Sequence, residues 1–251
     1  MQLIDTHCHI HEATYPLDLG EVLTRAHAAD VNQMIVVGTS EQSSREAITF
    51  AQNHEHIYAA IGVHPHDTKD GYSEIAALAA SHPVVAVGEI GLDYFYTHSP
   101  REMQIAALEA QLQVAMDHKL PVIFHVREAF DDFWPIFDNF PGLRGVLHSF
   151  TDTQANADAA MTRGLLIGLN GISTFTKDPL QQAMFAGLPL EHIVFETDAP
   201  FLTPKPFRGT VNEPAFVRTI AEHHATIRGI SLEEIAAATT ANARALFALS
   251  K

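Results

Sequence analysis

The sequence predicts an α/β protein of the (β/α)8 TIM-barrel class. Short β-branched or apolar runs alternate with longer amphipathic stretches along the chain. This pattern indicates parallel strands joined by right-handed helical crossovers. Eight such strand-like runs fit into about 200 residues, and eight strands are what closes a barrel of this kind. The total length of 251 residues also suits one barrel.

The expected elements follow in chain order. Strands are expected at Gln2–Asp5, Gln33–Val37, Tyr58–Gly62, Val84–Gly88, Val122–His125, Gly145–His148, Leu165–Leu169 and Ile193–Glu196. Helices are expected at Leu19–Ala29, Ser43–Asn53, Arg101–His118, Ala129–Asn139, Ala155–Arg163, Leu180–Ala186, Glu213–Ile227 and Ser231–Leu249. No low-complexity linker or charge block interrupts the alternation, so we predict a single TIM-barrel domain over residues 1–251.

Composition narrows the classes of function. Thirty acidic and fifteen basic residues give a formal charge of -15, which disfavours binding of nucleic acid through a broad basic face. A phosphate-bearing substrate would need local positive charge instead. One cysteine cannot form an internal disulfide, and no run approaches 18 apolar residues; we therefore expect a cytoplasmic protein without membrane contact. The sequence indicates no obligate protein partner.

The first strand ends in a pair of histidines that predicts a metal site. In Asp5-Thr6-His7-Cys8-His9, the alternation of a strand puts His7 and His9 on one side and Cys8 on the other. Two imidazoles about 7 Å apart along one strand can share an ion, given a rise of about 3.3 Å per residue. Cys8 is then interpreted as a packed core thiol.

Further ligand-type residues stand at the ends of other expected strands. Glu89 follows the fourth strand, His125 and His148 end the fifth and sixth, and Asp198 follows the eighth. Ionisable groups at the ends of apolar strands are costly to bury unless they are paired or bound to metal. Because active sites of such barrels lie at the carboxyl ends of the strands, the six positions are expected to converge.

Four imidazoles and two carboxylates exceed what one catalytic ion takes. We therefore expect two divalent ions with Glu89 as bridging ligand. His7, His9 and Asp198 would hold one ion, and His125 and His148 the other. Zinc, manganese and magnesium are the candidates, and the nitrogen-rich set favours zinc, manganese or iron over magnesium. Two ions suit phosphodiester hydrolysis. We expect Asp198 and Glu89 to be the catalytic residues, with Asp198 accepting the proton of the attacking water.

The chain resembles the TatD family of metal-dependent hydrolases within the amidohydrolase-like barrels. The resemblance covers essentially the whole length and rests on seven ordered blocks. They are Asp5-Thr6-His7-Cys8-His9, Gly62-Val63-His64-Pro65, Gly88-Glu89-Ile90-Gly91-Leu92-Asp93-Tyr94, His125 with Arg127, His148-Ser149-Phe150, Glu196-Thr197-Asp198-Ala199-Pro200-Phe201-Leu202 and Asn212-Glu213-Pro214. It implies a dinuclear metal-dependent hydrolase with phosphodiesterase activity, usually 3′–5′ exonuclease action on DNA. Nucleic acid or a nucleotide would then be the substrate, held through local phosphate contacts.

Other chemistry remains open at this point. The alternative function is a deacylase or esterase acting on an aminoacyl-tRNA or another small ester or amide through the same dinuclear site. A hydrolase with a carboxylated lysine is disfavoured because no lysine ends a strand. A non-enzymatic metal-binding or scaffold protein would need this end of the barrel to be closed to water.

Three residues are expected to bind substrate. His64 follows the third strand, Arg127 follows a ligand strand and Arg208 lies in the long loop after the eighth. The planar fork of arginine matches phosphate oxygens, although a salt bridge from Arg127 to Glu196 or Asp93 is a competing interpretation. The aromatic residues Phe95, Tyr96 and Phe150 could stack on a base, but packing at the rim of the barrel is the favoured explanation.

Overall fold

The computed structural model describes residues 1–250, which group into two compact units. The terminal unit comprises residues 1–35 and 149–250, and the central unit comprises residues 36–148. Within these residues eight strands occur, and their order in the sheet is the order of the sequence, β1 to β8. The expected single domain over residues 1–251 remains a prediction. Among the described residues, no helix combines the length and apolar composition needed to cross a bilayer.

The terminal unit contains the first and last elements of the chain. They are β1 (Leu3–Cys8), α1 (Leu19–Ala28), most of β2 (Val31–Val37), α6 (Gln154–Thr162), β7 (Leu166–Leu169), α7 (Ile172–Phe175), α8 (Pro179–Gly187), β8 (Ile193–Phe195), α9 (Val217–Arg228) and α10 (Leu232–Phe247), with 3-10 turns at Leu190–His192 and Pro214–Phe216. Strands β7 and β8 pair in parallel, and Cys8 bridges to Ala199. These pairings place the end of β1 beside the segment that follows β8.

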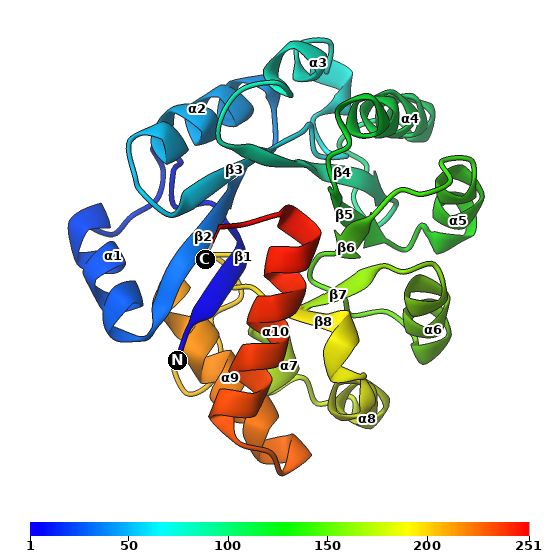
Figure 1. The fold of residues 1–251 in the computed structure, drawn as a ribbon. Coiled ribbons are helices and arrows are strands. Elements are labelled where there is room, and N and C mark those ends of the chain that lie inside the picture. Colours follow the sequence, from blue (N-terminus) through cyan, green and yellow to red (C-terminus); the bar gives the residue numbers. More distant parts are fainter. Residues whose placement is uncertain (251) are drawn as a thin grey trace. The chain divides into compact units, whose positions relative to one another are not determined.

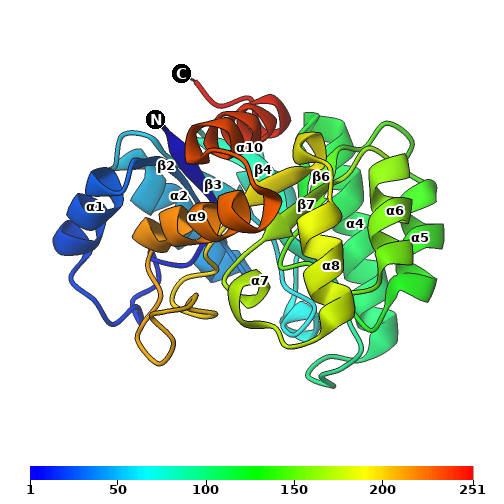
Figure 2. The ribbon, with the colours of Figure 1, turned by 90° about the horizontal axis from the view of Figure 1, so that it is seen from below.

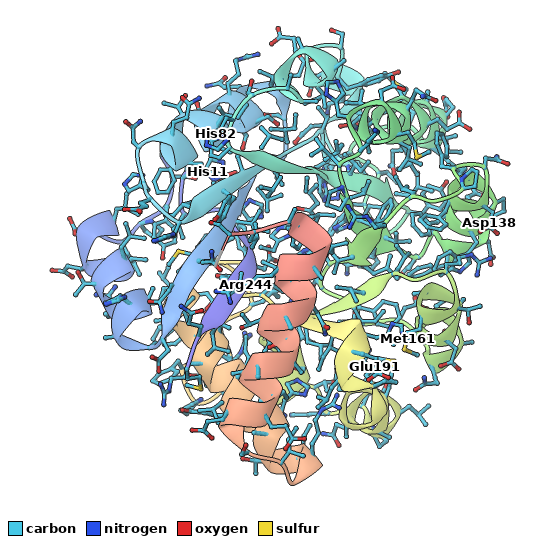
Figure 3. The ribbon with its side chains drawn as sticks, viewed as in Figure 1. His11, His82, Asp138, Met161, Glu191 and Arg244 are labelled. Atoms are coloured by element: carbon cyan, nitrogen blue, oxygen red, sulfur yellow. The ribbon has the colours of Figure 1, made fainter. Side chains whose placement is uncertain are left out.

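Helix α10, near the end of the described residues, packs against the first strand. It packs against β1, β8 and α9, and Figure 2 shows α9 and α10 side by side. Ser231 caps α10 by accepting a hydrogen bond from the N–H of Glu234 at 3.1 Å. The guanidinium of Arg244, labelled in Figure 3, donates to Gln2 Oε1 at 2.6 Å and to Gln33 Oε1 at 3.1 Å. These contacts anchor the strand that carries His7.

The central unit is a run of consecutive strands and helices. It contains α2 (Glu41–Gln52), β3 (Ile57–Ile61), a 3-10 turn (Thr68–Asp70), α3 (Ile75–Leu78), β4 (Val84–Asp93), α4 (Arg101–His118), β5 (Val122–Arg127), α5 (Phe130–Asp138) and β6 (Gly145–Leu147). Strands β3 to β6 pair in parallel with their neighbours, while α4 and α5 lie along one side of them (Figure 1). Buried apolar residues such as Ile61, Ile90 and Phe124 form the core.

Several strand predictions are too short, and the fourth differs most from the structure. The expected fourth strand ends at Gly88, but β4 continues to Asp93. Its second half pairs with β5, with Gly91 opposite His125 and Asp93 opposite Arg127. Glycine permits this because a Cβ at position 91 would fall on the backbone carbonyl of His125. Gly91 thus allows the two strands to approach closely.

The expected helix at Glu213–Ile227 also differs in the structure. It is divided into a 3-10 turn at Pro214–Phe216 and α9 from Val217. The short helices α3 and α7 were not expected, because four residues are too few to show a helical period.

Candidate metal centre

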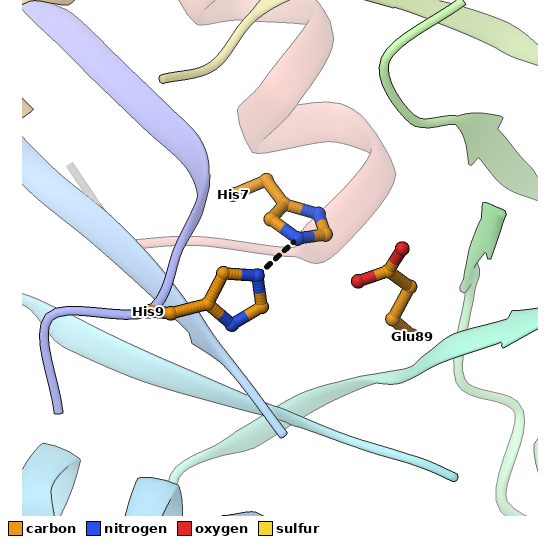
Figure 4. A group of neighbouring side chains, drawn as sticks. All are labelled: His7, His9 and Glu89. Carbon is orange, nitrogen blue, oxygen red and sulfur yellow. Dashed lines mark hydrogen bonds between the residues drawn. The ribbon is translucent and has the colours of Figure 1, made fainter. Parts of the chain in front are cut away.

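The end of β1 and the segment after β8 form the first cluster of metal-type ligands. His7 Nε2 and His9 Nε2 lie 3.1 Å apart, as drawn in Figure 4, and Asp198 Oδ1 lies 3.6 and 3.3 Å from them respectively. Cys8 is fully buried, and its Sγ contacts the carbonyl of Ile35 at 3.6 Å. The alternation predicted for this strand is therefore confirmed. We call His7, His9 and Asp198 the HxH set.

Backbone hydrogen bonds hold the HxH set together. The N–H of Asp198 donates to His7 O, and the N–H of His9 donates to Ala199 O, both at 2.8 Å. Asp198 has a φ of 59°, in the left-handed region that non-glycine residues seldom adopt. Such a conformation persists where the surroundings determine it and is common at functional sites. The turn directs the carboxylate toward the two imidazoles.

The buried carboxylate of Asp5 accepts hydrogen bonds that stabilise the same turn. Its Oδ1 accepts from the N–H of Thr197 at 2.9 Å and from that of His7 at 3.3 Å. Its Oδ2 accepts from the Thr197 hydroxyl at 2.6 Å. Burial raises the pKa of Asp5 to about 8, although these hydrogen bonds act in the opposite direction. Asp5 thus links the start of the HxH set to its end, a role that the sequence analysis missed.

A second cluster surrounds the buried carboxylate of Glu89. Its Oε1 lies 2.9 Å from His125 Nδ1, 3.5 Å from His64 Nε2 and 3.7 Å from His148 Nε2. The structure therefore brings Glu89, His125 and His148 together, and it adds His64, which was expected only to contact substrate. Burial lowers the pKa of His64 well below its usual value, and neighbouring His125 contributes, so His64 offers a neutral nitrogen. We call these four residues the Glu89 set.

Asp93 orients the Glu89 set, a role that was not predicted from the sequence. Its Oδ2 accepts hydrogen bonds from the Nε2 atoms of His125 and His66, both at 3.0 Å. Burial alone would raise the pKa of Asp93, but the hydrogen bonds from His125 and the N–H of Tyr96 lower it below its usual value. For His125, burial lowers the pKa while Asp93 and Glu89 raise it, and the net shift is upward. Had β4 been predicted to run past Gly88, its alternation would have placed Asp93 on the side of Glu89.

The donor geometry of both sets fits divalent cations. Two ligands about 2.05 Å from a tetrahedral ion lie about 3.3 Å apart. The separations within the HxH set are 3.1–3.6 Å, and those around Glu89 Oε1 are 2.9–3.7 Å. His125 also donates one ring N–H to Asp93 and leaves Nδ1 facing Glu89, as metal-binding histidines do when a carboxylate fixes their tautomer.

The two arginines that were expected to bind substrate stack on aromatic rings. The guanidinium carbon of Arg127 lies 3.9 Å from the centre of the Phe95 ring, and that of Arg208 lies 3.9 Å from the centre of the Phe175 ring. Both arginines are exposed, as a substrate-binding role requires. Glu196 is fully buried and accepts a hydrogen bond from the N–H of Ser149 at 2.6 Å.

The sequence model of the TatD related DNase family matches residues 4–248. The chain belongs to this family. It is 36% identical over 254 residues to an uncharacterized metal-dependent hydrolase, YabD, of Bacillus subtilis, with 99% of this chain and 100% of YabD covered. It is also 36% identical over 259 residues to the 3′-5′ ssDNA/RNA exonuclease TatD of Salmonella typhimurium, with 98% of each chain covered.

Among solved structures, the TatD homolog YJJV of Escherichia coli superposes with a TM-score of 0.91 at 30% identity, covering 99% of this chain and 98% of YJJV. The predicted barrel fold is confirmed by this match and by the strand order. Family membership also confirms the expected class of enzyme, a metal-dependent hydrolase of the TatD family, and its need for a divalent metal.

Proposed function

We propose that this TatD-family protein is a dinuclear phosphodiesterase that removes nucleotides from the 3′ end of single-stranded DNA. The main support is the pair of donor sets, which lie in or just beyond the carboxyl-terminal halves of their strands and have separations that suit a divalent cation. The 3′-5′ ssDNA/RNA exonucleases at 35–36% identity supply the class of substrate. The single, buried Cys8 supports a reducing cytoplasmic location.

Each set would hold one cation. Bound divalent cations would lower the pKa of an attacking water and offset negative charge on the phosphoryl oxygens. Asp198 would accept the proton of that water, because its Oδ1 faces the HxH imidazoles and its side chain keeps 14% of its surface exposed. His125 would offer its Nδ1 to the cation beside Glu89, with Asp93 fixing the ring through Nε2.

Exposed arginines would bind the substrate locally. The formal charge of -15 opposes long-range attraction of a polyanion, so contacts near the scissile bond must position it. Arg127 and Arg208 present guanidinium groups beside aromatic rings, and such planar forks bind phosphate oxygens. His64, with a lowered pKa, would add a neutral group near Glu89.

The role of Asp198 is tested by Asp198→Asn with bound metal measured in parallel. The amide keeps the shape of the side chain but cannot take the proton, so turnover should fall about 100-fold to 10,000-fold. Asp131→Asn, at an exposed position on α5, is the matched control. Full turnover in an Asp198→Asn protein that keeps its metal would exclude Asp198 as the proton acceptor.

The substrate is tested with a panel of single-stranded DNA, RNA and acylated nucleotides, assayed with the same metal-loaded preparation. We expect mononucleotides to be released from a 3′-labelled DNA strand. Hydrolysis of the acyl substrate without cleavage of DNA or RNA would replace the proposal with the deacylase alternative.

A further inference from the structure

The loop that follows β4 presents two aromatic side chains to solvent. Phe95 is 48% exposed and Tyr96 is 41% exposed. Packing at the rim of the barrel was the expected explanation for Phe95, Tyr96 and Phe150. It holds only for Phe150, which is 4% exposed. Large aromatic rings cost free energy when they face water, so two adjacent exposed rings indicate a surface that meets a ligand.

The two exposed rings are held on a fixed backbone. Asp93 Oδ1 accepts hydrogen bonds from the N–H groups of Phe95 and Tyr96 at 3.0 and 2.9 Å. The side-chain amide of Gln104 donates to Asp93 O and Ser99 O, both at 3.0 Å. The loop is thus tied at its beginning and its end, which reduces the entropy lost when a ligand binds.

The guanidinium group of Arg127 completes this surface. The guanidinium carbon of Arg127 lies 3.9 Å from the centre of the Phe95 ring and 5.0 Å from that of Tyr96. The two rings pack edge to face with centres 4.7 Å apart. We call Phe95, Tyr96 and Arg127 the aromatic platform. It combines flat apolar faces with a fork for phosphate.

The platform is joined to the Glu89 set through one carboxylate. Asp93 holds the platform loop with Oδ1 and holds His125 and His66 with Oδ2. The ring of Tyr96 also packs against His66, with centres 5.3 Å apart. A group resting on the platform therefore lies close to the candidate metal ligands of the same unit.

We propose that the aromatic platform stacks one unpaired base of a single-stranded nucleic-acid substrate while Arg127 contacts the adjoining phosphate. This inference rests on the proposed function. Stacking suits an acidic protein because it does not depend on net charge, and it tolerates any sequence because every base has a π face. It also favours single strands, since bases in a duplex are already stacked. The platform is thus a substrate-positioning surface that sets affinity for unpaired ends.

The test uses metal-loaded protein and short single-stranded DNA in which one abasic residue replaces each of the three 3′-terminal nucleotides in turn. For the wild type, KM should rise about 5-fold to 100-fold at the position whose base stacks, as loss of one stacked base predicts. Phe95→Leu and Tyr96→Leu keep apolar volume but lose the flat ring. They should raise KM for intact DNA by a similar factor, change kcat little, and bring the ratio of abasic to intact KM toward one. Phe95→Trp keeps a flat ring and should show the wild-type ratio of abasic to intact KM.

Leu180→Ala is the control, because Leu180 is 80% exposed on a helix of the other unit. It should keep the wild-type ratio, and thermal unfolding should show that all variants are folded. If the wild type cleaves DNA but the Leu variants keep its ratio of KM values, the platform inference is wrong and the proposed function stands. If the wild type cleaves none of the strands, the proposed function is wrong and the inference falls with it.

Discussion

The two donor sets gather similar ligands in different ways. The HxH set takes both histidines from one strand and its carboxylate from one neighbouring turn, joined by backbone hydrogen bonds at 2.8 Å. The Glu89 set takes Glu89 and His125 from β4 and β5, and His64 and His148 from the segments just after β3 and β6. The three histidines converge on one carboxylate oxygen of Glu89. Local spacing builds the histidine pair of the first set, and pairing of β1 with the turn after β8 adds Asp198. The register of four strands builds the second set. Damage to strand register should therefore affect the Glu89 set more than the HxH set.

The largest expected effect tests whether both sets serve one reaction. His9→Ala and His148→Ala should each lower kcat/KM about a thousandfold, equivalent to about 4 kcal/mol of transition-state stabilisation. The double variant should lose little more, because residues that act as a unit are not additive. The measurements are kcat/KM and bound metal for the four proteins of the cycle, with exposed His118→Ala as control. Losses that multiply would show that the sets act independently.

Gly91→Ala should damage the Glu89 set through strand register. The added Cβ would fall on the carbonyl of His125, so β4 and β5 must separate at the point that positions Glu89 and His125. We expect a loss of about 3 kcal/mol or more in the free energy of unfolding, together with weaker metal binding. Gly187→Ala is the matched control, because a Cβ there meets nothing within 4 Å. Denaturant unfolding and metal titration would compare the two, and equal stability would contradict the register argument.

Asp93→Asn should weaken the Glu89 set without unfolding the protein. The amide is nearly isosteric but loses the charge that holds His125 and His66. Metal affinity should fall about 10-fold to 100-fold, which is typical when the partner of a ligating histidine is removed. Competition with a chelator measures this affinity. Unchanged affinity would mean that Asp93 does not orient a ligand.

Thr197→Val should give the smallest effect, on the HxH set. It removes the hydroxyl that donates to buried Asp5 at 2.6 Å, which should cost about 1–3 kcal/mol of unfolding free energy. Activity should fall only severalfold, because the backbone hydrogen bonds that hold Asp198 remain. Thr197→Ser keeps a hydroxyl and should restore most of the stability. Urea unfolding compares the three proteins, and equal stability of the Val variant and the wild type would contradict the role of Asp5.

The sequence by itself determined the order of the elements and the identity of six candidate ligands. Alternation of apolar runs gives parallel strands, and parallel strands bring their carboxyl ends to one edge. His7 and His9 were predictable as a pair because strand alternation is a local property. Family motifs at the ends of the strands then gave the class of hydrolase.

Only the tertiary structure decided which side chains meet across strands. The continuation of β4 to Asp93 depends on its close pairing with β5, so neither Asp93 nor the inclusion of His64 in the Glu89 set follows from local sequence. Tertiary packing likewise separates buried Phe150 from exposed Phe95, although both are aromatic residues just beyond a strand. Burial and cross-strand register depend on residues that are distant in sequence, so a local pattern of residues does not reveal them.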